Sequence, residues 1–143
     1  MKKYVWLPLI LIAVFGSAAV TNAQSRLRAT VPFDFIVGDT PVSAGQITVR
    51  SVSSSALAPL AISNFEKRQH VMQIGHNLGS NDSEAQCKLV FRKYGNRYYL
   101  GQVWIAGYQS LEFSKSKSER AERNTMLSKN STPELVTVTA DMQ

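Results

Sequence analysis

The stretch KLVFRKYGNRYYLGQVWI, from Lys88 to Ile105, decides the fold because it predicts a β-hairpin with a defined register. Two runs rich in β-branched and aromatic residues flank Gly95-Asn96, a pair suited to a two-residue primed turn. A turn at this position places Arg92 opposite Tyr99 across the two strands. The segment therefore predicts an antiparallel pair of strands near the middle of the domain.

The two faces of this predicted hairpin differ in composition. Strict alternation from the turn gives one face the composition of a core, with Leu89, Phe91, Tyr98, Leu100 and Trp104. The opposite face carries charged and tyrosine side chains near the turn, and we expect it to be exposed to solvent. This candidate surface patch consists of Arg92, Tyr94, Arg97 and Tyr99.

Most of the remaining chain also alternates with period two, which is typical of half-buried strands. Further strands are expected at Leu27–Val37, Gln46–Val52, Leu57–Phe65, Val71–Ile74 and Leu135–Ala140. Pro32 cannot donate to a ladder, so Leu27–Val37 is either an edge strand or a strand interrupted at that residue. The polar stretch Asn77–Gln86 is expected to be a loop.

One helix is predicted, and it lies near the C-terminus. Ser116 and Glu119 match a capping box at its start, and Glu119 with Arg123 forms a favourable i, i+4 pair. The segment to about Lys129 has few apolar residues, so we expect a surface helix. The fold class is therefore mainly β, an antiparallel sandwich or barrel of about seven short strands with one C-terminal surface helix.

The N-terminal segment has the three parts of a secretory signal peptide. Lys2 and Lys3 precede the apolar run Val5–Phe15, and small residues follow up to Ala23. We expect a signal peptide at residues 1–23 and a single β-rich domain at residues 24–143; an uncleaved membrane anchor is the alternative. The expected location is the periplasm or the extracellular space, with no transmembrane helix in the mature chain.

The sequence offers little chemistry for catalysis, and we expect no enzyme, cofactor or metal site. His70 and His76 are the only histidines, and no carboxylate cluster accompanies them. The single Cys87 excludes an intrachain disulfide, and a small buried residue is its commoner role. Asp34, between two phenylalanines, is expected to accept a hydrogen bond at a strand end or turn.

The candidate patch supports one functional hypothesis and one structural alternative. Arginine and tyrosine together suit an anionic glycan or another anionic polymer of the cell envelope. The alternative is cross-strand packing of Arg and Tyr without a ligand. Nucleic acid is disfavoured as a partner because the chain is expected to be exported.

Several short motifs carry a resemblance that spans nearly all of the expected mature chain. They are Val31-Pro32-Phe33-Asp34-Phe35, Val37-Gly38, Ala44-Gly45, Leu89-Val90-Phe91, Tyr94-Gly95, Tyr98-Tyr99-Leu100 and Val103-Trp104. In this order they resemble a recurrent group of small uncharacterised exported proteins of acidobacteria. Val42-Ser43 departs from the Leu-Pro of that group. The resemblance implies export and architecture, and it transfers no catalytic residue.

Three classes of function remain open from the sequence. The favoured class is a small exported envelope or binding module with no recognisable catalytic site. The second is an accessory subunit of an exported assembly, which would bind another exported protein by strand addition to an exposed edge strand at Leu27–Val37. The third is an enzyme with an unrecognised site, for which a pocket lined by Asp34, a histidine and Cys87 would be the sign.

Overall fold

The structure is a computed structural model, and it describes residues 26–52, 59–79, 86–107 and 109–143. The expected signal peptide at residues 1–23 lies outside these residues. In chain order the elements are β1 (Arg26–Val31), β2 (Phe35–Val37), β3 (Thr40–Val42), β4 (Gly45–Ser51), β5 (Pro59–Asn64), β6 (Gln69–Ile74), β7 (His76–Gly79), β8 (Cys87–Tyr94), β9 (Arg97–Ile105), β10 (Gln109–Glu112), α1 (Lys117–Ser128) and β11 (Glu134–Met142).

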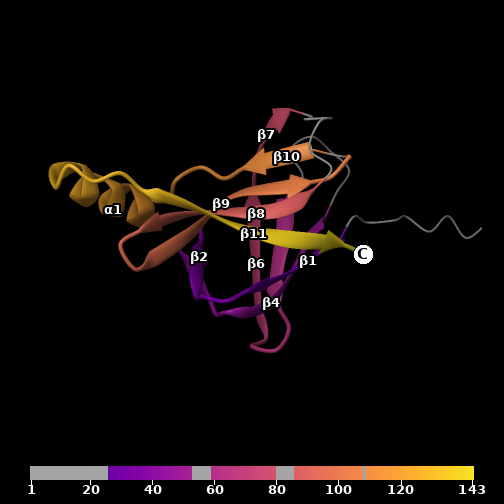
Figure 1. Cartoon of the computed structure of the whole chain (residues 1–143). Helices are drawn as coiled ribbons and strands as arrows, with labels where there is room; N and C mark the ends of the chain where they lie inside the picture. The colour runs from indigo at the N-terminus through magenta and orange to yellow at the C-terminus, as the bar shows by residue number, and fades with distance from the viewer. Residues whose placement is uncertain (1–25, 53–58, 80–85, 108) are drawn as a thin grey trace, which may run out of the picture.

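The strands form one nearly closed, barrel-like sheet in the order β3-β2-β9-β8-β11-β1-β4-β5-β6 (Figure 1). β10 pairs with β9 and with β7, and β7 continues from β6 after the single residue Gly75. Through β7 and β10, the end of the sheet at β6 is therefore connected back to β9, so the sheet is almost closed. A Cβ at Gly75 would lie 3.0 Å from the Cβ of Leu111, so this close approach of β10 leaves little room for a side chain.

The predicted class, mainly β with one C-terminal helix, is confirmed. Of the two predicted architectures, sandwich and barrel, the structure has the barrel-like sheet. Within the described residues the sheet has eleven strands rather than about seven. The additional strands β2, β3, β7 and β10 have only three or four residues each, which is too short for a clear period. Asn77, expected in a loop, belongs to β7.

The prediction that Leu27–Val37 is an edge strand is wrong, and the interruption at Pro32 is the correct alternative. β1 ends at Val31 and pairs with β4 on one side and β11 on the other. After the break, β2 pairs with β3 and makes a parallel contact with β9 at Ile36 and Tyr99. Strand addition at Leu27–Val37 therefore has no free edge to use.

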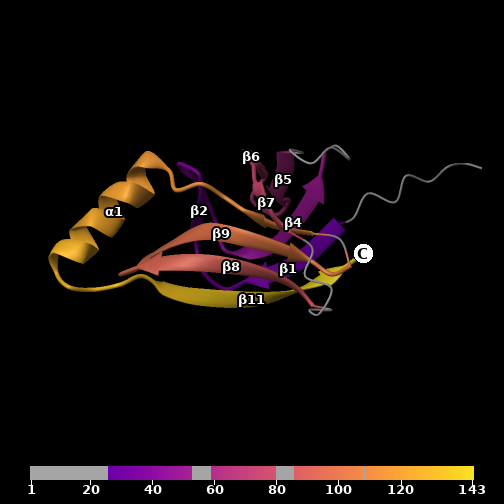
Figure 2. The same ribbon diagram turned by 90° about the horizontal axis from the view of Figure 1, so that it is seen from above.

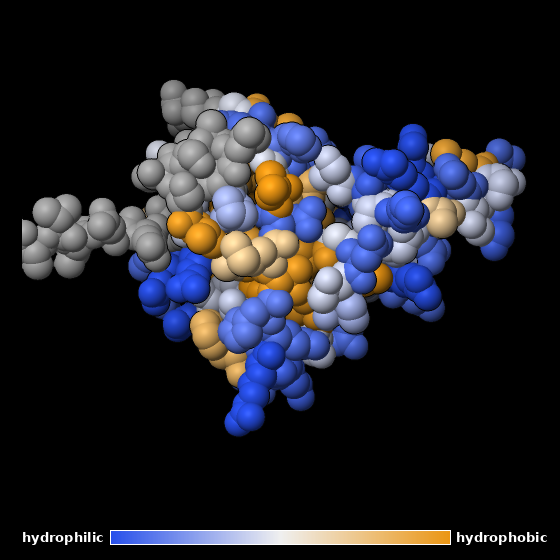
Figure 3. Space-filling view, turned by 180° about the vertical axis from the view of Figure 1, so that it is seen from behind, coloured by the Kyte–Doolittle hydropathy of each residue, from blue (hydrophilic) through white to orange (hydrophobic). Residues whose placement is uncertain are grey.

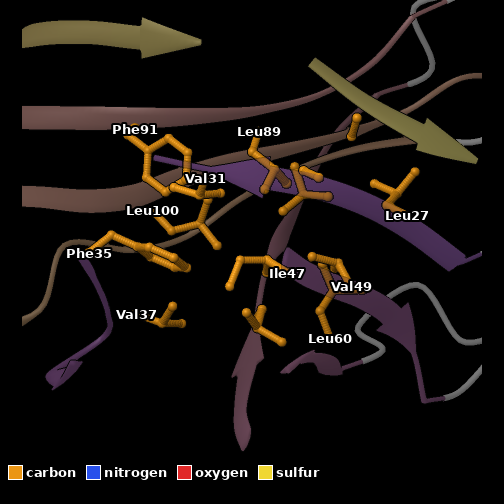
Figure 4. Close-up of a cluster of buried hydrophobic side chains, with 14 of the residues drawn as sticks. Leu27, Val31, Phe35, Val37, Ile47, Val49, Leu60, Leu89, Phe91 and Leu100 are labelled. Carbon is orange, nitrogen blue, oxygen red and sulfur yellow. The ribbon is translucent and has the colours of Figure 1, made fainter. Parts of the chain in front are cut away.

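Alternate residues of the strands fill the interior of the barrel (Figure 4). Val31, Ile47 and Leu60 from β1, β4 and β5 are fully buried, as are Leu89 and Phe91 from β8. Their sequence neighbours point outward, because successive side chains of a strand face opposite sides. The outer faces of β1 and β4 are consequently free to carry polar residues.

The hairpin forms with the predicted turn, and Gly95 has a φ of 60°, which suits the first central position of a primed turn. Arg92 lies opposite Tyr99, as predicted. Farther from the turn the register changes, because Phe91 pairs with Leu100 while Val90 pairs with Gln102. Gly101 is therefore an extra residue in β9, a β-bulge.

This bulge reverses the faces of the rest of β9, so the prediction that Trp104 belongs to the core is wrong. Val103 and Ile105 join Leu100 in the core, whereas Trp104 is half-buried on the outer face. There the ammonium of Lys88 lies 4.5 Å from the centre of the Trp104 ring, and the indole N–H donates to Gln102 Oε1 over 3.0 Å.

We predict that Phe91→Ala destabilises the protein far more than Trp104→Ala. Removing a buried Phe side chain costs about 3–5 kcal/mol, since it leaves a cavity. The half-buried indole is not part of the interior, so we expect its removal to cost about 1 kcal/mol or less. Urea unfolding of both variants provides the measurement. Equal losses would place Trp104 in the core after all.

Candidate functional site

The prediction that the patch at the hairpin turn is exposed to solvent is wrong, because three of its four residues are buried. Arg92, Tyr94 and Tyr99 are only 7%, 2% and 1% exposed. Arg97 alone remains exposed, and its guanidinium pairs with Glu122 at 3.0 Å. Figure 2 shows the reason, since α1 lies beside the turn end of β8 and β9. The structure therefore brings the four residues together, but beneath or against a helix.

A buried ion pair joins the hairpin to this helix. The Arg92 Nε and Nη2 atoms both donate to the carboxylate of Glu119, the Nη2 contact measuring 3.0 Å. Nη2 also donates to the Phe113 carbonyl at 3.1 Å, and the Tyr94 hydroxyl donates to Glu119 Oε1 at 2.9 Å. Glu119 is 2% exposed, so its carboxylate is shielded from water and satisfied by two partners.

Local structure at the start of α1 supports this contact. Ser116 is the N-cap, and its hydroxyl accepts from the Glu119 N–H at 3.3 Å, as the predicted capping box requires. Asp39, in the turn between β2 and β3, accepts from the Ser118 hydroxyl at 2.7 Å. The hydrogen bonds from the Ser118 and Ser116 hydroxyls hold the pKa of Asp39 below its usual value.

The environment of the two tyrosines differs in a way that the sequence does not reveal. Burial first, and then the hydrogen bond and charge of Glu119, raise the pKa of Tyr94 to about 12. The Tyr99 ring packs against Tyr94 edge to face, with centroids 5.6 Å apart, and its buried hydroxyl has no hydrogen-bond partner among the described residues. The cluster is closed to solvent, so its geometry serves to anchor α1.

We predict that Glu119→Gln destabilises the protein by about 3–5 kcal/mol, because it removes the buried partner of the Arg92 charge and leaves only the partly exposed carboxylate of Glu112 at 3.8 Å. Replacing both members, Arg92→Met with Glu119→Leu, is expected to cost less than Glu119→Gln alone. Glu122→Gln is the matched control, since it breaks the exposed pair with Arg97 and is expected to cost about 1 kcal/mol or less. Urea unfolding measures all three. A Glu119→Gln loss no larger than that of the control would show that the pair does not hold the helix.

The raised pKa of Tyr94 predicts a pH dependence of stability. The unfolded phenol ionises near pH 10, whereas the folded group holds its proton to about pH 12. The stabilisation is therefore complete below about pH 10 and is lost as the pH rises toward about 12. Urea unfolding across this interval should show a smaller decline for Tyr94→Phe than for the unchanged protein. Parallel declines would mean that Tyr94 ionises normally when folded.

The other residues that the sequence singled out lie apart and make local contacts. Asp34 accepts a hydrogen bond from the Ala44 N–H at 2.8 Å, which confirms its expected structural role. His70 bonds Ser63 at 3.0 Å, and His76 bonds Ser114 at 2.9 Å. Cys87 is buried in the core, as expected for a small apolar residue. Over residues 26–52, 59–79, 86–107 and 109–143, no three His, Cys, Asp or Glu side chains are grouped as a metal site would require.

A pocket of about 120 Å³ lies elsewhere, on the outer face of the sheet formed by β1, β4 and β5. Its walls combine three arginines with hydroxyl side chains and one aromatic ring. The lining residues are Arg26, Leu27, Arg28, Thr48, Arg50, Ser63, Phe65 and Gln143. The arginines point outward because their neighbours Leu27 and Val49 point into the core.

The charges of this pocket, which we call the arginine pocket, are not neutralised. Arg26 lies directly opposite Arg50 across β1 and β4. Among the described residues, neither of them nor Arg28 makes a side-chain hydrogen bond or an ion pair within 4.0 Å, although Asp141 lies opposite Arg28 in β11. Like charges placed opposite each other disfavour folding, so the arrangement is suited to an anion that lies between them.

The aromatic wall of the pocket is also exposed. The Phe65 ring is 66% exposed and meets the His70 ring edge to face, with centroids 5.6 Å apart. His70 in turn holds the Ser63 hydroxyl at the pocket wall. Together with the guanidinium groups, which form paired hydrogen bonds to carboxylate or phosphate, the pocket can hold an anionic group beside a ring or apolar surface.

The arginine pocket was not predicted from the sequence, although the sequence contains part of the pattern that forms it. Arg26 and Arg28 alternate with Leu27 and Ala29, which places both arginines on the outer face of one strand. That β1 pairs with β4, and so sets Arg26 opposite Arg50, depends on a long-range pairing that the period does not reveal.

Comparisons of this chain with protein-family models, with curated proteins and with solved structures find no match. Within the part of the chain that the structure describes, no helix combines the length and the apolar character needed to cross a membrane.

Proposed function

We propose that this protein is an exported binding module without catalytic activity, and that it holds an anionic component of the cell envelope in the arginine pocket. The observation that carries the proposal is the convergence, beside the exposed Phe65 ring, of three guanidinium groups that have no ion-pair partner among the described residues. An ordinary surface would pair these charges or separate them. Here the fold places two of them directly opposite each other.

The chemistry of arginine indicates the class of ligand. Guanidinium groups form paired hydrogen bonds with carboxylate and phosphate, and their charge does not depend on pH in the ordinary range. An anionic polymer of the envelope offers such groups repeatedly, and the apolar face of a sugar ring can pack on Phe65. This keeps the class of partner expected from the sequence, but it moves the binding surface from the hairpin turn to β1 and β4.

Two further features support export and a binding role. The signal-peptide pattern of residues 1–23 and the resemblance to small exported acidobacterial proteins both favour the envelope over the cytoplasm. Without Lys2 and Lys3 the expected mature chain has 14 basic and 10 acidic residues, and its net charge of +4 favours association with anionic material. Asp34, His76 and Cys87 make local contacts with residues that do not line the pocket. His70 holds the Ser63 hydroxyl at the pocket wall, but among the described residues no carboxylate is hydrogen-bonded to His70, as a catalytic triad would require.

We predict that Arg26→Gln with Arg50→Gln weakens binding to isolated envelopes and to polygalacturonate by about tenfold, because each exposed charge contact contributes up to about 1 kcal/mol. Binding of the unchanged protein should also fall as salt is raised, since exposed charges are screened. Co-sedimentation at low and high salt measures the first probe, and calorimetric titration measures the second.

The matched control is Arg120→Gln with Lys129→Gln, which removes the same number of charges from the exposed surface at α1. It should leave binding nearly unchanged if the pocket, rather than the net charge, is responsible. The stability of the Arg26 and Arg50 variant should stay the same or rise slightly, because a pair of like charges is removed. Equal loss of binding in both double variants would overturn the proposal.

A further inference from the structure

The outer face beside the arginine pocket carries apolar side chains that the barrel interior does not use. On β6 the alternate residues Met72 and Ile74 are 60% and 56% exposed, and Leu78 on β7 is 47% exposed. Phe65 follows β5, which pairs with β6, so Phe65, Met72 and Ile74 lie on one side of the barrel, and Leu78 follows beyond the far end of β6. Figure 3 shows this side, with apolar surface near the middle of the molecule and hydrophilic residues around it.

The strand register makes the basic and apolar residues parts of one surface. Arg26 is opposite Arg50, Arg50 is opposite Ala61, and Ala61 is opposite Met72. These four residues form a row across β1, β4, β5 and β6. Neighbouring strands lie about 4.8 Å apart, so the backbones of Arg26 and Met72 are separated by roughly 15 Å along the sheet. The row runs from cationic to apolar without leaving the outer face.

The charge around this row is predominantly positive. The basic residues of this face and of the turn between β5 and β6 are Arg26, Arg28, Arg50, Lys67 and Arg68, whereas the acidic residues are Glu66 and Asp141. Counted over side chains alone, five positive and two negative groups leave a local charge of +3, with His70 taken as neutral. A hydrated anionic polymer would bind the arginines, but it would leave the apolar side chains of Met72 and Ile74 exposed to water.

We infer that this face, formed by β1, β4, β5 and β6, docks on the surface of a bilayer that contains anionic lipids. The arginines bind headgroup phosphates, while Phe65, Met72 and Ile74 enter the boundary between headgroups and acyl chains. This is the pattern of peripheral membrane attachment, in which apolar burial and attraction to anionic lipid act together. The inference rests on the proposed function, because the same arginines bind the anion, and it names a lipid headgroup as the source.

The exposed apolar side chains and the positive charge of this face favour an anionic bilayer over a second copy of the chain as the binding partner. Two copies placed face to face would bring two clusters of charge +3 together, which disfavours association. An anionic bilayer instead attracts each arginine and accepts the adjacent apolar side chains. The contact would hold the protein at the membrane surface without a spanning segment in the described residues.

The test uses the expected mature chain, residues 24–143, so that the apolar run Val5–Phe15 cannot bind lipid, with vesicles of phosphatidylcholine alone and of phosphatidylcholine with phosphatidylglycerol in equal parts. The protein should co-sediment with the anionic vesicles and remain free with the neutral ones. Arg26→Gln with Arg50→Gln should weaken vesicle binding about 25-fold, because each basic residue near the surface contributes about fivefold. Met72→Ser with Ile74→Ser should weaken it roughly tenfold, because less apolar surface is buried.

The control for the apolar pair is Leu127→Ser with Leu135→Ser, which removes two exposed leucines from α1 and β11. Circular dichroism of each variant confirms that it is folded, which is expected because all four positions are exposed. The Leu127 and Leu135 variant should bind vesicles like the unchanged protein. Equal vesicle binding by the Met72 and Ile74 variant and the unchanged protein would overturn the inference.

Polygalacturonate, tested in parallel, separates failure of the inference from failure of the proposed function. Arginine-dependent binding of the polymer without binding of anionic vesicles would overturn the lipid surface and leave the arginine pocket as a polymer site. Absence of arginine-dependent binding to both probes would overturn both proposals. Arginine-dependent vesicle binding that also requires Met72 and Ile74 supports the lipid surface.

Discussion

One extra residue in β9 determines how the hairpin at the centre of the barrel meets the rest of the molecule. Gly101 has no partner in β8, so the alternation of inward and outward side chains restarts after it. Val103 and Ile105 thereby join Leu100 inside, and Trp104 is carried to the outer face. The absence of a side chain also matters, because a Cβ at Gly101 would lie 2.9 Å from the Arg92 guanidinium. The bulge thus directs Val103 and Ile105 into the core on one face and leaves space for the Arg92 guanidinium on the other.

The space left at Gly101 accommodates the Arg92 guanidinium, which forms the buried ion pair with Glu119. This ion pair explains how a polar helix is held on the barrel. α1 buries only Glu119 within its length, so apolar packing cannot fix its position. A buried ion pair adds little net stability, but breaking it costs several kcal/mol, which penalises alternative positions of the helix. Arg97 with Glu122 and Asp39 with Ser118 place further constraints on the same element. The residues that resembled a binding patch are therefore used to assemble the fold.

The opposite side of the barrel carries residues that folding does not require. Closing the sheet buries alternate residues of β1, β4 and β5. The outward positions on β1 and β4 hold arginines that have no ion-pair partner in the part of the chain that the structure describes. On β6 the outward positions hold Met72 and Ile74. Both features disfavour an isolated soluble domain, one through repulsion of like charges and the other through exposed apolar area. Their position in one cross-strand row is the physical basis for a binding function at this face.

The sequence by itself determined the features that depend on neighbouring residues. Period-two alternation indicated most of the longer strands, Gly95-Asn96 set the hairpin register near the turn, and Ser116 with Glu119 marked the start of α1. The tertiary structure alone decided the closure of the sheet, the burial of Arg92 and the meeting of Arg26 with Arg50. Glu119 lies 27 residues from Arg92, and the bulge between them reverses the alternation. Local patterns state which side chains share a face of one strand, whereas long-range pairing decides what covers that face.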